Sequence, residues 1–129
     1  RTVPCHNDTL AENFMYDGTT MRVIDWEYSG MNDAHYDISC IVVEIPLDKE
    51  YEEILLKAYC GGEPSEIERA RHTINKFLVT AHWSTWSLVQ ICYGKDADFY
   101  WEYGRQRAEQ ACGFLDEPEF EHYLEIIGG

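Results

Sequence analysis

Basic residues are scarce in this sequence, and their scarcity excludes one class of partner. The 129 residues include 10 Lys and Arg against 24 Asp and Glu, which gives a formal net charge of -14. Because a surface this acidic repels phosphate backbones, we expect no binding to nucleic acid. The same surface favours a cationic ligand, but the charge alone favours an ordinary acidic protein without such a ligand.

The sequence also lacks the cysteine spacings of metal sites and disulfide frameworks. Its five cysteines are far apart, and no C-x-x-C pair occurs. An odd number of scattered cysteines is typical of reduced thiols in a cytoplasmic protein. No apolar run is long enough to span a bilayer, and no signal peptide is present, so we expect a cytoplasmic protein without membrane insertion.

The first third of the chain predicts one small β-hairpin. Asp17-Gly18 separates two apolar stretches and favours a tight turn, so the hairpin is expected over residues 13–25. A polar loop over residues 4–13 precedes it, and residues 26–35, with their Gly, Asn and Asp, are expected to form another loop. The polar residues of the chain concentrate in this third.

Start and stop signals predict that the remainder is helical. Ser65 and Glu68 form a capping box that opens a long helix, and Gly94 ends it. Pro46 ends the first helix, and Asp96 is the expected N-cap of the fourth. The chain is therefore predicted to be a single domain, mainly α with a small β-hairpin. The predicted helices cover residues 36–44, 47–60, 65–93, 97–112 and 116–127.

Polar side chains near the N-terminus have the composition that phosphoryl transfer requires. That reaction needs a carboxylate beside the acceptor hydroxyl and oxygen ligands for Mg²⁺. Asp8 could accept the hydroxyl proton, and Asn13 could supply a neutral oxygen to the metal. The hairpin would fold Asp25 back towards both residues as a second metal ligand. His6 is expected to brace the loop through hydrogen bonds.

Each of these residues taken alone is more often structural than catalytic, but together they form a family pattern. H-N-D at residues 6–8, Asn13, and I-D-W-E at residues 24–27 resemble H-x-D-x-x-x-x-N and I-D-[FW]-E. These are the catalytic and metal motifs of the aminoglycoside phosphotransferase and choline/ethanolamine kinase superfamily. The resemblance implies the protein-kinase-like fold, with ATP and Mg²⁺ bound between two lobes, and residues 1–129 as the C-terminal lobe.

Two further stretches resemble choline kinases within that superfamily. After I-D-W-E-Y, the family has [YF]-D-I and a downstream acidic residue, which correspond to Asp37 and Glu44. The resemblance implies that Glu27 and Asp37 support the catalytic region and that Glu44 lies on the substrate side. W-S-T-W-S-L-V-Q at residues 83–90 is similar to the family's W-x-x-W-S-[IL]-[VI]-Q.

By that resemblance, Trp83 and Trp86 face the trimethylammonium group of choline. Tyr103 matches a third aromatic wall of the choline site, and Tyr51 is a further candidate. Aromatic faces and nearby carboxylates suit a quaternary ammonium ion because its methyl groups donate no strong hydrogen bond.

The long helix gives an argument that does not depend on the family. At about 100° per residue its apolar side chains share one stripe, which we expect to be the core face. Trp83 and Trp86 lie roughly opposite that stripe, so they must be buried against something else. The residues alone favour a second packed helix, and an aromatic cage for a cation is the alternative. The predicted stripe consists of Ile67, Ala70, Ile74, Phe77, Leu78, Ala81, Leu88 and Cys92.

Features of a complete ATP site are missing. No G-x-G-x-x-G and no G-x-x-x-x-G-K occurs, and the four lysines all lie in predicted helices or at their ends. The chain opens at Arg1 without an initiator Met, directly on its polar motif, which we interpret as a cut through a larger protein. The N-terminal ATP-binding lobe would then be absent, and this lobe alone would be inactive.

The leading hypothesis is ATP- and Mg²⁺-dependent phosphorylation of the choline hydroxyl, which gives phosphocholine. A kinase of ethanolamine, another amino alcohol or an aminoglycoside is the nearest alternative, because an acidic pocket could accept any of these cations. A lobe that binds quaternary amines without catalysis is the third, although such a binder would not need the metal ligands Asn13 and Asp25.

Overall fold

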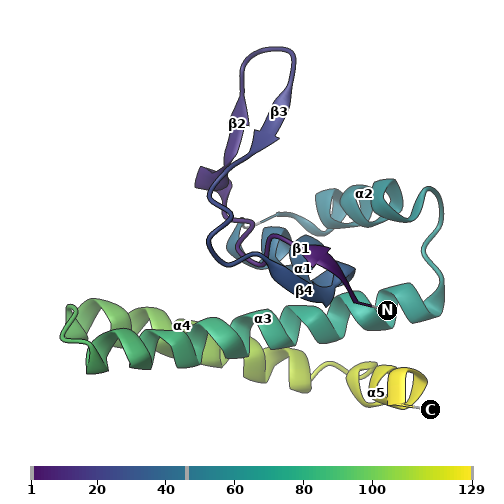
Figure 1. Cartoon of the computed structure of the whole chain (residues 1–129). Helices are drawn as coiled ribbons and strands as arrows, with labels where there is room; N and C mark the ends of the chain where they lie inside the picture. The colour runs from purple at the N-terminus through teal and green to yellow at the C-terminus, as the bar shows by residue number, and fades with distance from the viewer. Residues whose placement is uncertain (1, 46, 129) are drawn as a thin grey trace.

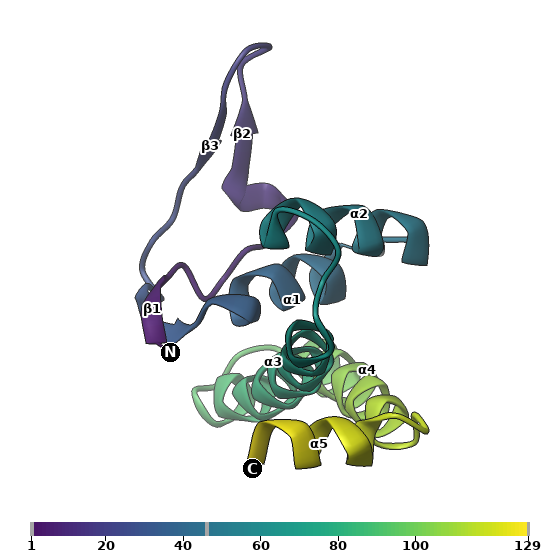
Figure 2. The same cartoon turned by 90° about the vertical axis from the view of Figure 1, so that its right-hand side faces the viewer.

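The structure is a computed structural model and describes residues 2–45 and 47–128. In this part of the chain, five α-helices and two small sheets form two layers. The long α3 and α4 run side by side with α5 in one layer, and α1 lies between α3 and α2 (Figures 1 and 2). The predicted mainly helical fold is confirmed, whereas the stop signal at Pro46 lies outside the described residues. The helices are α1 Ala34–Glu44, α2 Lys49–Cys60, α3 Glu66–Cys92, α4 Ala97–Leu115 and α5 Phe120–Gly128.

Helix caps appear at the predicted positions. The Ser65 hydroxyl accepts a hydrogen bond from the amide of Glu68, and the Glu68 carboxylate accepts one from the amide of Ser65 at 2.6 Å. Gly61 ends α2 with φ 71°, and Gly94 follows α3 with φ 78°. The Asp96 carboxylate caps α4. These local signals are confirmed because each depends only on residues within one helical turn.

The last helix starts later than predicted. The signal at residues 116–119 was expected to open it, but Asp116 closes α4 as its C-cap, and its amide donates to the carbonyl of Cys112. The residues that follow form a turn before α5 begins at Phe120. A short acidic stretch after a helix can therefore end that helix rather than start the next one.

The N-terminal third holds two strand pairs rather than one. β2 (Phe14–Tyr16) and β3 (Met21–Val23) form the predicted hairpin, which projects away from the helices (Figure 1). β1 (Thr2–Cys5) pairs antiparallel with β4 (Gly30–Asp33). The prediction that residues 26–35 form a loop is therefore wrong for β4. This strand has no alternating apolar pattern, and its partner is distant in sequence, so no local signal marks it.

The predicted core stripe of α3 is wrong. Of its members only Ala70 is buried, whereas Ile67 is 56% and Leu88 46% exposed. The helix is covered on two sides, by α1 and by α4 with α5, so no single apolar stripe describes its buried surface. The core cluster instead joins two layers through Tyr36, Cys40 and Val43 of α1 and Val79 and Trp83 of α3.

A small residue allows α4 to approach α3 closely. A Cβ at Gly104 would lie 1.9 Å from the Oγ of Ser87, so a larger side chain would push the helices apart. The Ser84 hydroxyl donates to the carbonyl of Gly104 at 2.9 Å, and the Ser87 hydroxyl donates to the carbonyl of Ser84 at 2.7 Å. This contact fixes the turn of α4 that carries Tyr103 beside α3.

Four polar side chains join α1, α2 and α3, and we call them the inter-helix cluster: Ser39, Glu52, His72 and Lys76. The Ser39 Oγ lies 3.0 Å from Nδ1 of His72, whose Nε2 lies 2.9 Å from Oε1 of Glu52. The Lys76 ammonium donates to the same oxygen at 2.7 Å. Burial alone would raise the pKa of Glu52, but hydrogen bonds from His72 and Lys76 outweigh it and lower the pKa to about 2.

The described residues contain no helix that combines the length and the apolar content needed to cross a membrane.

Candidate active site

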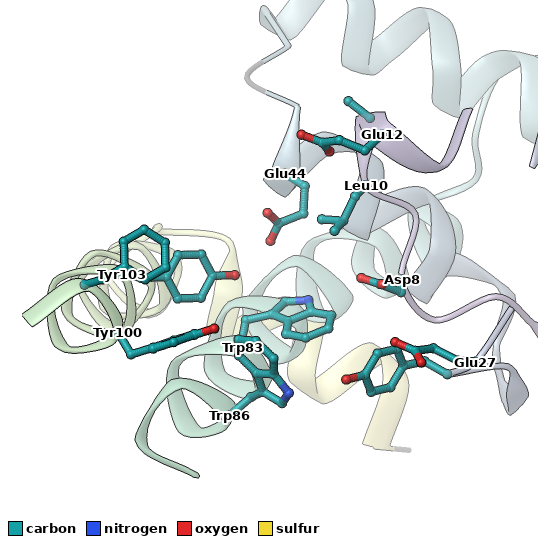
Figure 3. Close-up of a pocket in the computed structure, with 12 residues that line it drawn as sticks. Asp8, Leu10, Glu12, Glu27, Glu44, Trp83, Trp86, Tyr100 and Tyr103 are labelled. Carbon is teal, nitrogen blue, oxygen red and sulfur yellow. The ribbon is translucent and has the colours of Figure 1, made fainter. Parts of the chain in front are cut away.

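A cavity of about 540 Å³ opens where the N-terminal loops, α1, α3 and α4 meet (Figure 3). Acidic side chains come from the loops and α1, and aromatic side chains come mainly from α3 and α4. Of the ten residues that the sequence predicts for the site, six line this cavity. Its lining residues are Asp8, Leu10, Ala11, Glu12, Glu27, Tyr28, Glu44, Trp83, Trp86, Phe99, Tyr100 and Tyr103.

The loop that carries Asp8 is fixed by hydrogen bonds from residues behind the cavity. The Asp37 carboxylate accepts from the backbone amides of His6 at 2.8 Å and Asn7 at 2.7 Å. The buried His6 ring bridges two segments, because Nε2 lies 2.8 Å from the carbonyl of Ile24 and Nδ1 accepts from the amide of Asp8 at 3.3 Å. Neither His6 nor Asp37 lines the cavity; both hold the loop in place.

Asp8 is a buried carboxylate with one uncommitted oxygen. The residue is 7% exposed, and its Oδ1 has no hydrogen-bond partner among the described residues. Burial raises the pKa of Asp8; His6 opposes this, and the charges of Asp25 and Glu27 add to it. A carboxylate whose pKa is raised in this way is a better proton acceptor than an ordinary surface aspartate.

The two predicted metal ligands lie near Asp8 but outside the cavity lining. The Asn13 amide nitrogen donates to the carbonyl of Asp8 at 2.9 Å, so its oxygen is the end left for another partner. Asp25 follows β3 with φ 63°, a left-handed conformation that is unusual for a residue other than glycine. Asp8, Asn13, Asp25 and Glu27 offer only oxygen atoms, the ligands that Mg²⁺ prefers.

These residues do not make a closed metal cage. Within the described residues, no group of three or more His, Cys, Asp or Glu side chains is arranged to hold an ion. Mg²⁺ commonly takes one or two protein carboxylates and completes its shell with water and phosphate oxygens. The amide oxygen of Asn13 and the carboxylate of Asp25 therefore fit magnesium held jointly with a phosphate ligand, not magnesium held by the protein alone.

Aromatic rings form a connected wall along the helical side of the cavity. Trp83 and Trp86 meet edge to face with centroids 5.4 Å apart, and Trp86 continues the wall to Tyr100 at 5.7 Å and Tyr103 at 6.5 Å. On the other side Tyr28 meets Trp83 at 6.0 Å. In Figure 3 the two tryptophans and the two α4 tyrosines face the cavity together.

Trp83 packs against a second helix, α1, which is one of the two alternatives left open by the helical pattern, whereas the aromatic cage for a cation stays a prediction. It is 5% exposed and belongs to the core cluster between α1 and α3, and it also lines the cavity. Its indole Nε1 is buried and has no partner within the described residues. Trp86 is half-buried and packs against the cluster from the cavity side.

Several lining residues were missed by the sequence analysis. Tyr28 directly follows the I-D-W-E motif, and Tyr100 lies three residues before Tyr103, on the same face of α4. Both signals could have been found. By contrast, Tyr51, a further candidate wall, lies on α2, is 58% exposed and does not line the cavity.

Glu44 reaches the cavity from the end of α1, but as half of an ion pair. Arg107 of α4 donates from Nη2 to Oε2 of Glu44 at 2.5 Å, and its guanidinium lies 5.1 Å from the centroid of the Tyr103 ring. The other oxygen, Oε1, is buried without a partner among the described residues. Burial raises the pKa of Glu44, and Arg107 opposes that rise. The sequence analysis missed Arg107.

Comparison with known proteins shows the class to which this fold belongs. Residues 1–72, more than half of the chain, match the phosphotransferase enzyme family, APH. The chain therefore belongs to this family. The matched segment contains Asp8, Asn13, Asp25 and Glu44.

Choline and ethanolamine kinases are among the proteins that this chain resembles. Protein LicA of Haemophilus influenzae is 33% identical over 88% of the chain. The solved structure of a choline/ethanolamine kinase family protein from Mesorhizobium loti covers 97% of the chain with a TM-score of 0.88 and 35% identity. That of choline kinase LicA from Streptococcus pneumoniae covers 89% with a TM-score of 0.71 and 29% identity.

These similarities confirm the predicted protein-kinase-like fold and the resemblance to choline and ethanolamine kinases. The chain spans less than half of each relative: 44% of the Haemophilus protein, and 43% and 40% of the two solved chains.

Proposed function

We propose that this chain is the catalytic, acceptor-binding lobe of a kinase that uses ATP and Mg²⁺ to phosphorylate the hydroxyl of choline, giving phosphocholine. One observation carries the proposal: a single cavity joins the uncommitted carboxylate oxygen of Asp8 to a wall of aromatic rings. Choline has the matching two ends, a hydroxyl and a cation that donates no strong hydrogen bond.

The aromatic wall suits the trimethylammonium end. A quaternary ammonium ion is attracted to the faces of Trp and Tyr rings, and its methyl groups gain apolar contact there. Trp83, Trp86 and Tyr103 would form this cage, and Tyr100 would extend it. The aminoglycoside hypothesis is less well supported, because polyamine sugars need many carboxylates rather than aromatic faces.

The carboxylate suits the hydroxyl end. With choline on the aromatic wall, Asp8 would accept the hydroxyl proton as the oxygen attacks the γ-phosphorus of ATP. The bond from that phosphorus to the β,γ-bridging oxygen breaks, and ADP leaves with the electron pair. His6 and Asp37 would act by holding the Asp8 loop, and Glu27 by adding negative charge beside it.

Asn13 and Asp25 would hold Mg²⁺ together with the phosphates. When bound, the ion offsets the negative charge of the transferring phosphoryl group. Most of the contacts that bind ATP would come from an N-terminal lobe, because this chain has neither a glycine-rich phosphate-binding loop nor a phosphate-binding lysine on a β-strand. We infer that the lobe alone is inactive and that the reaction takes place in the cytoplasm.

A substrate comparison with the complete protein tests the proposal. With ATP and Mg²⁺, we expect phosphocholine as product, faster turnover of choline than of ethanolamine, and loss of turnover on chelation by EDTA that added Mg²⁺ restores. Equal or faster turnover of ethanolamine would refute the choline assignment. Tight choline binding by the isolated chain, with no turnover by the complete protein, would support a binding lobe instead.

Ethanolamine remains the second candidate because of Glu44. Its Oε1 is a buried acceptor without a partner among the described residues, and a primary ammonium could donate to it. We place choline first because the aromatic rings outnumber such acceptors on the cavity wall.

A further inference from the structure

We propose that Arg107 is a specificity-determining residue of the amine site, which biases the cavity towards quaternary and against primary ammonium ions. It would do so by occupying one oxygen of Glu44 and by fixing the ring of Tyr103. The inference rests on the proposed function, because it assumes that an amino alcohol binds in this cavity.

Arg107 is held firmly between α4 and α1. Besides its contact with Glu44, its Nη1 donates to the carbonyl of Val43 at 3.2 Å and to Oε1 of Gln110 at 3.1 Å. The side chains of Arg107 and Glu44 are only 16% and 8% exposed. A largely buried guanidinium with acceptors on two helices has one strongly favoured position. It therefore imposes a defined charge distribution on this end of the cavity.

That charge distribution discriminates between the two kinds of cation. Paired with Arg107, Glu44 has little net charge left to attract a ligand, and a single oxygen, Oε1, remains free of partners among the described residues. A primary ammonium that leaves water must replace several hydrogen bonds, and one shared carboxylate replaces few of them. A trimethylammonium group has none to replace. The ion pair thus penalises the primary amine more.

Tyr103 connects the same arginine to the aromatic cage. The guanidinium carbon lies 5.1 Å from the ring centroid, within the range of a cation–π contact. Arg107 therefore covers the ring on one side and restrains its orientation. The Tyr103 ring also meets Trp86, so a displaced Tyr103 would open the wall that receives the methyl groups.

Removal of the guanidinium charge tests the inference. We would measure the dissociation constants of choline and ethanolamine by calorimetry, with the complete protein as the parent chain and with its Arg107→Gln variant. The ratio of the ethanolamine constant to the choline constant should fall roughly tenfold in the variant. A loss of folding stability alone would weaken both amines together and leave the ratio unchanged.

Arg105→Gln is the matched control. Arg105 lies on the same helix and pairs with the exposed Glu102 and Glu109, away from the cavity lining. Its ratio should equal that of the parent chain. Arg107→Lys keeps the charge but not the planar fork, so its ratio should fall between the parent and Arg107→Gln.

The possible failures are distinguishable. If the parent chain binds neither amine, the proposed function is overturned and this inference with it. If the parent binds choline and Arg107→Gln keeps the parent ratio, the inference alone is overturned. If Arg107→Gln does not fold, Arg107→Lys decides: a ratio reduced about threefold supports the inference, and an unchanged ratio overturns it.

Discussion

Two groups of buried polar side chains in this chain differ in whether their polar atoms have hydrogen-bond partners. In the inter-helix cluster, Glu52 accepts from Lys76 and lies against His72, and no buried side-chain atom of the cluster lacks a partner among the described residues. On the cavity wall, three buried side-chain atoms lack a hydrogen-bond partner: Asp8 Oδ1, Glu44 Oε1 and Trp83 Nε1. They are three of the four such atoms in the part of the chain that the structure describes.

This difference separates the polar side chains that stabilise the fold from those that could bind a ligand. Each buried polar atom without a partner costs about 1–3 kcal/mol of stability. A cluster that satisfies its atoms joins helices, whereas a cavity that leaves them open is prepared for a ligand that supplies the missing donors and acceptors. Ser39, His72 and Glu52 have the residue types of a catalytic triad, but the Ser39 hydroxyl is fully buried and already donates to the carbonyl of His72.

Asp8→Asn should have the largest effect and should affect turnover only. In the complete protein, turnover of choline should fall by about 10²–10⁴-fold, because the amide cannot accept the hydroxyl proton. Choline binding should persist, and the melting temperature of the chain should not fall, because burial already disfavours the charged form of Asp8. Phosphocholine formation and thermal denaturation measure the two effects. Normal turnover in this variant would contradict the assignment of Asp8.

Glu52→Gln should have the opposite effect to Asp8→Asn, because it should change stability and not the choline site. We expect the free energy of unfolding to fall by about 2–3 kcal/mol at neutral pH while choline affinity stays unchanged. Glu50→Gln, at an exposed position of the same helix, is the control and should be nearly neutral. A change in choline affinity without loss of stability would contradict the division between the two groups.

The pH dependence of stability follows from the same residue. The pKa of Glu52 is about 2 in the folded chain against the ordinary value of 4.5. Because the folded pKa is the lower one, the stabilisation is complete above pH 4.5 and is lost as the pH falls towards 2. Urea denaturation at several pH values should show the difference between the parent and Glu52→Gln narrowing across that window. A constant difference would contradict it.

Trp86→Leu should weaken choline binding by roughly 5–30-fold, in line with about 1–2 kcal/mol for the loss of a cation–π face. Trp86 is chosen over Trp83 because Trp83 also belongs to the core cluster. Trp101→Leu is the control, since Trp101 is 61% exposed on α4 and does not line the cavity. Equal losses of affinity in the two variants, measured by calorimetry, would argue against the aromatic wall.

The smallest expected effect is on the titration of Asp8. Its pKa is raised by burial and further by Asp25 and Glu27, so its midpoint in the chain should lie above the ordinary 3.8. Glu27→Gln should lower that midpoint, because it removes one of the like charges. Carboxyl carbon NMR shifts can follow this titration. A midpoint at or below 3.8 in the parent would contradict the electrostatic description of the site.

Local signals in the sequence predicted most of the fold. The capping box at Ser65, the left-handed glycines and the Asp17-Gly18 hairpin were found because each signal and its effect lie within a few residues. The candidate site was predicted on a different basis, the resemblance of two contiguous motifs, one in a loop and one in a helix, to those of choline kinases. Asp8 and Trp83 indeed line one cavity.

Long-range contacts escaped the sequence analysis. β4 pairs with β1 at the other end of the first third, and Arg107 lies 63 residues from Glu44. No periodic pattern in the sequence indicates a contact between residues so far apart. The core stripe of α3 failed for a related reason: the helix packs on two sides, and small residues such as Thr80 and Ser87, both fully buried, fill those interfaces. Hydrophobicity alone does not mark them.

Intermolecular nuclear Overhauser effects between choline and the 129-residue chain test the central claim most directly. The account predicts contacts from the choline methyl protons to the ring protons of Trp86 and Tyr103, and none to the exposed rings of Tyr51 and Tyr93. Contacts to Tyr51 or Tyr93, or none to the cavity rings in a chain that is saturated with choline, would contradict it.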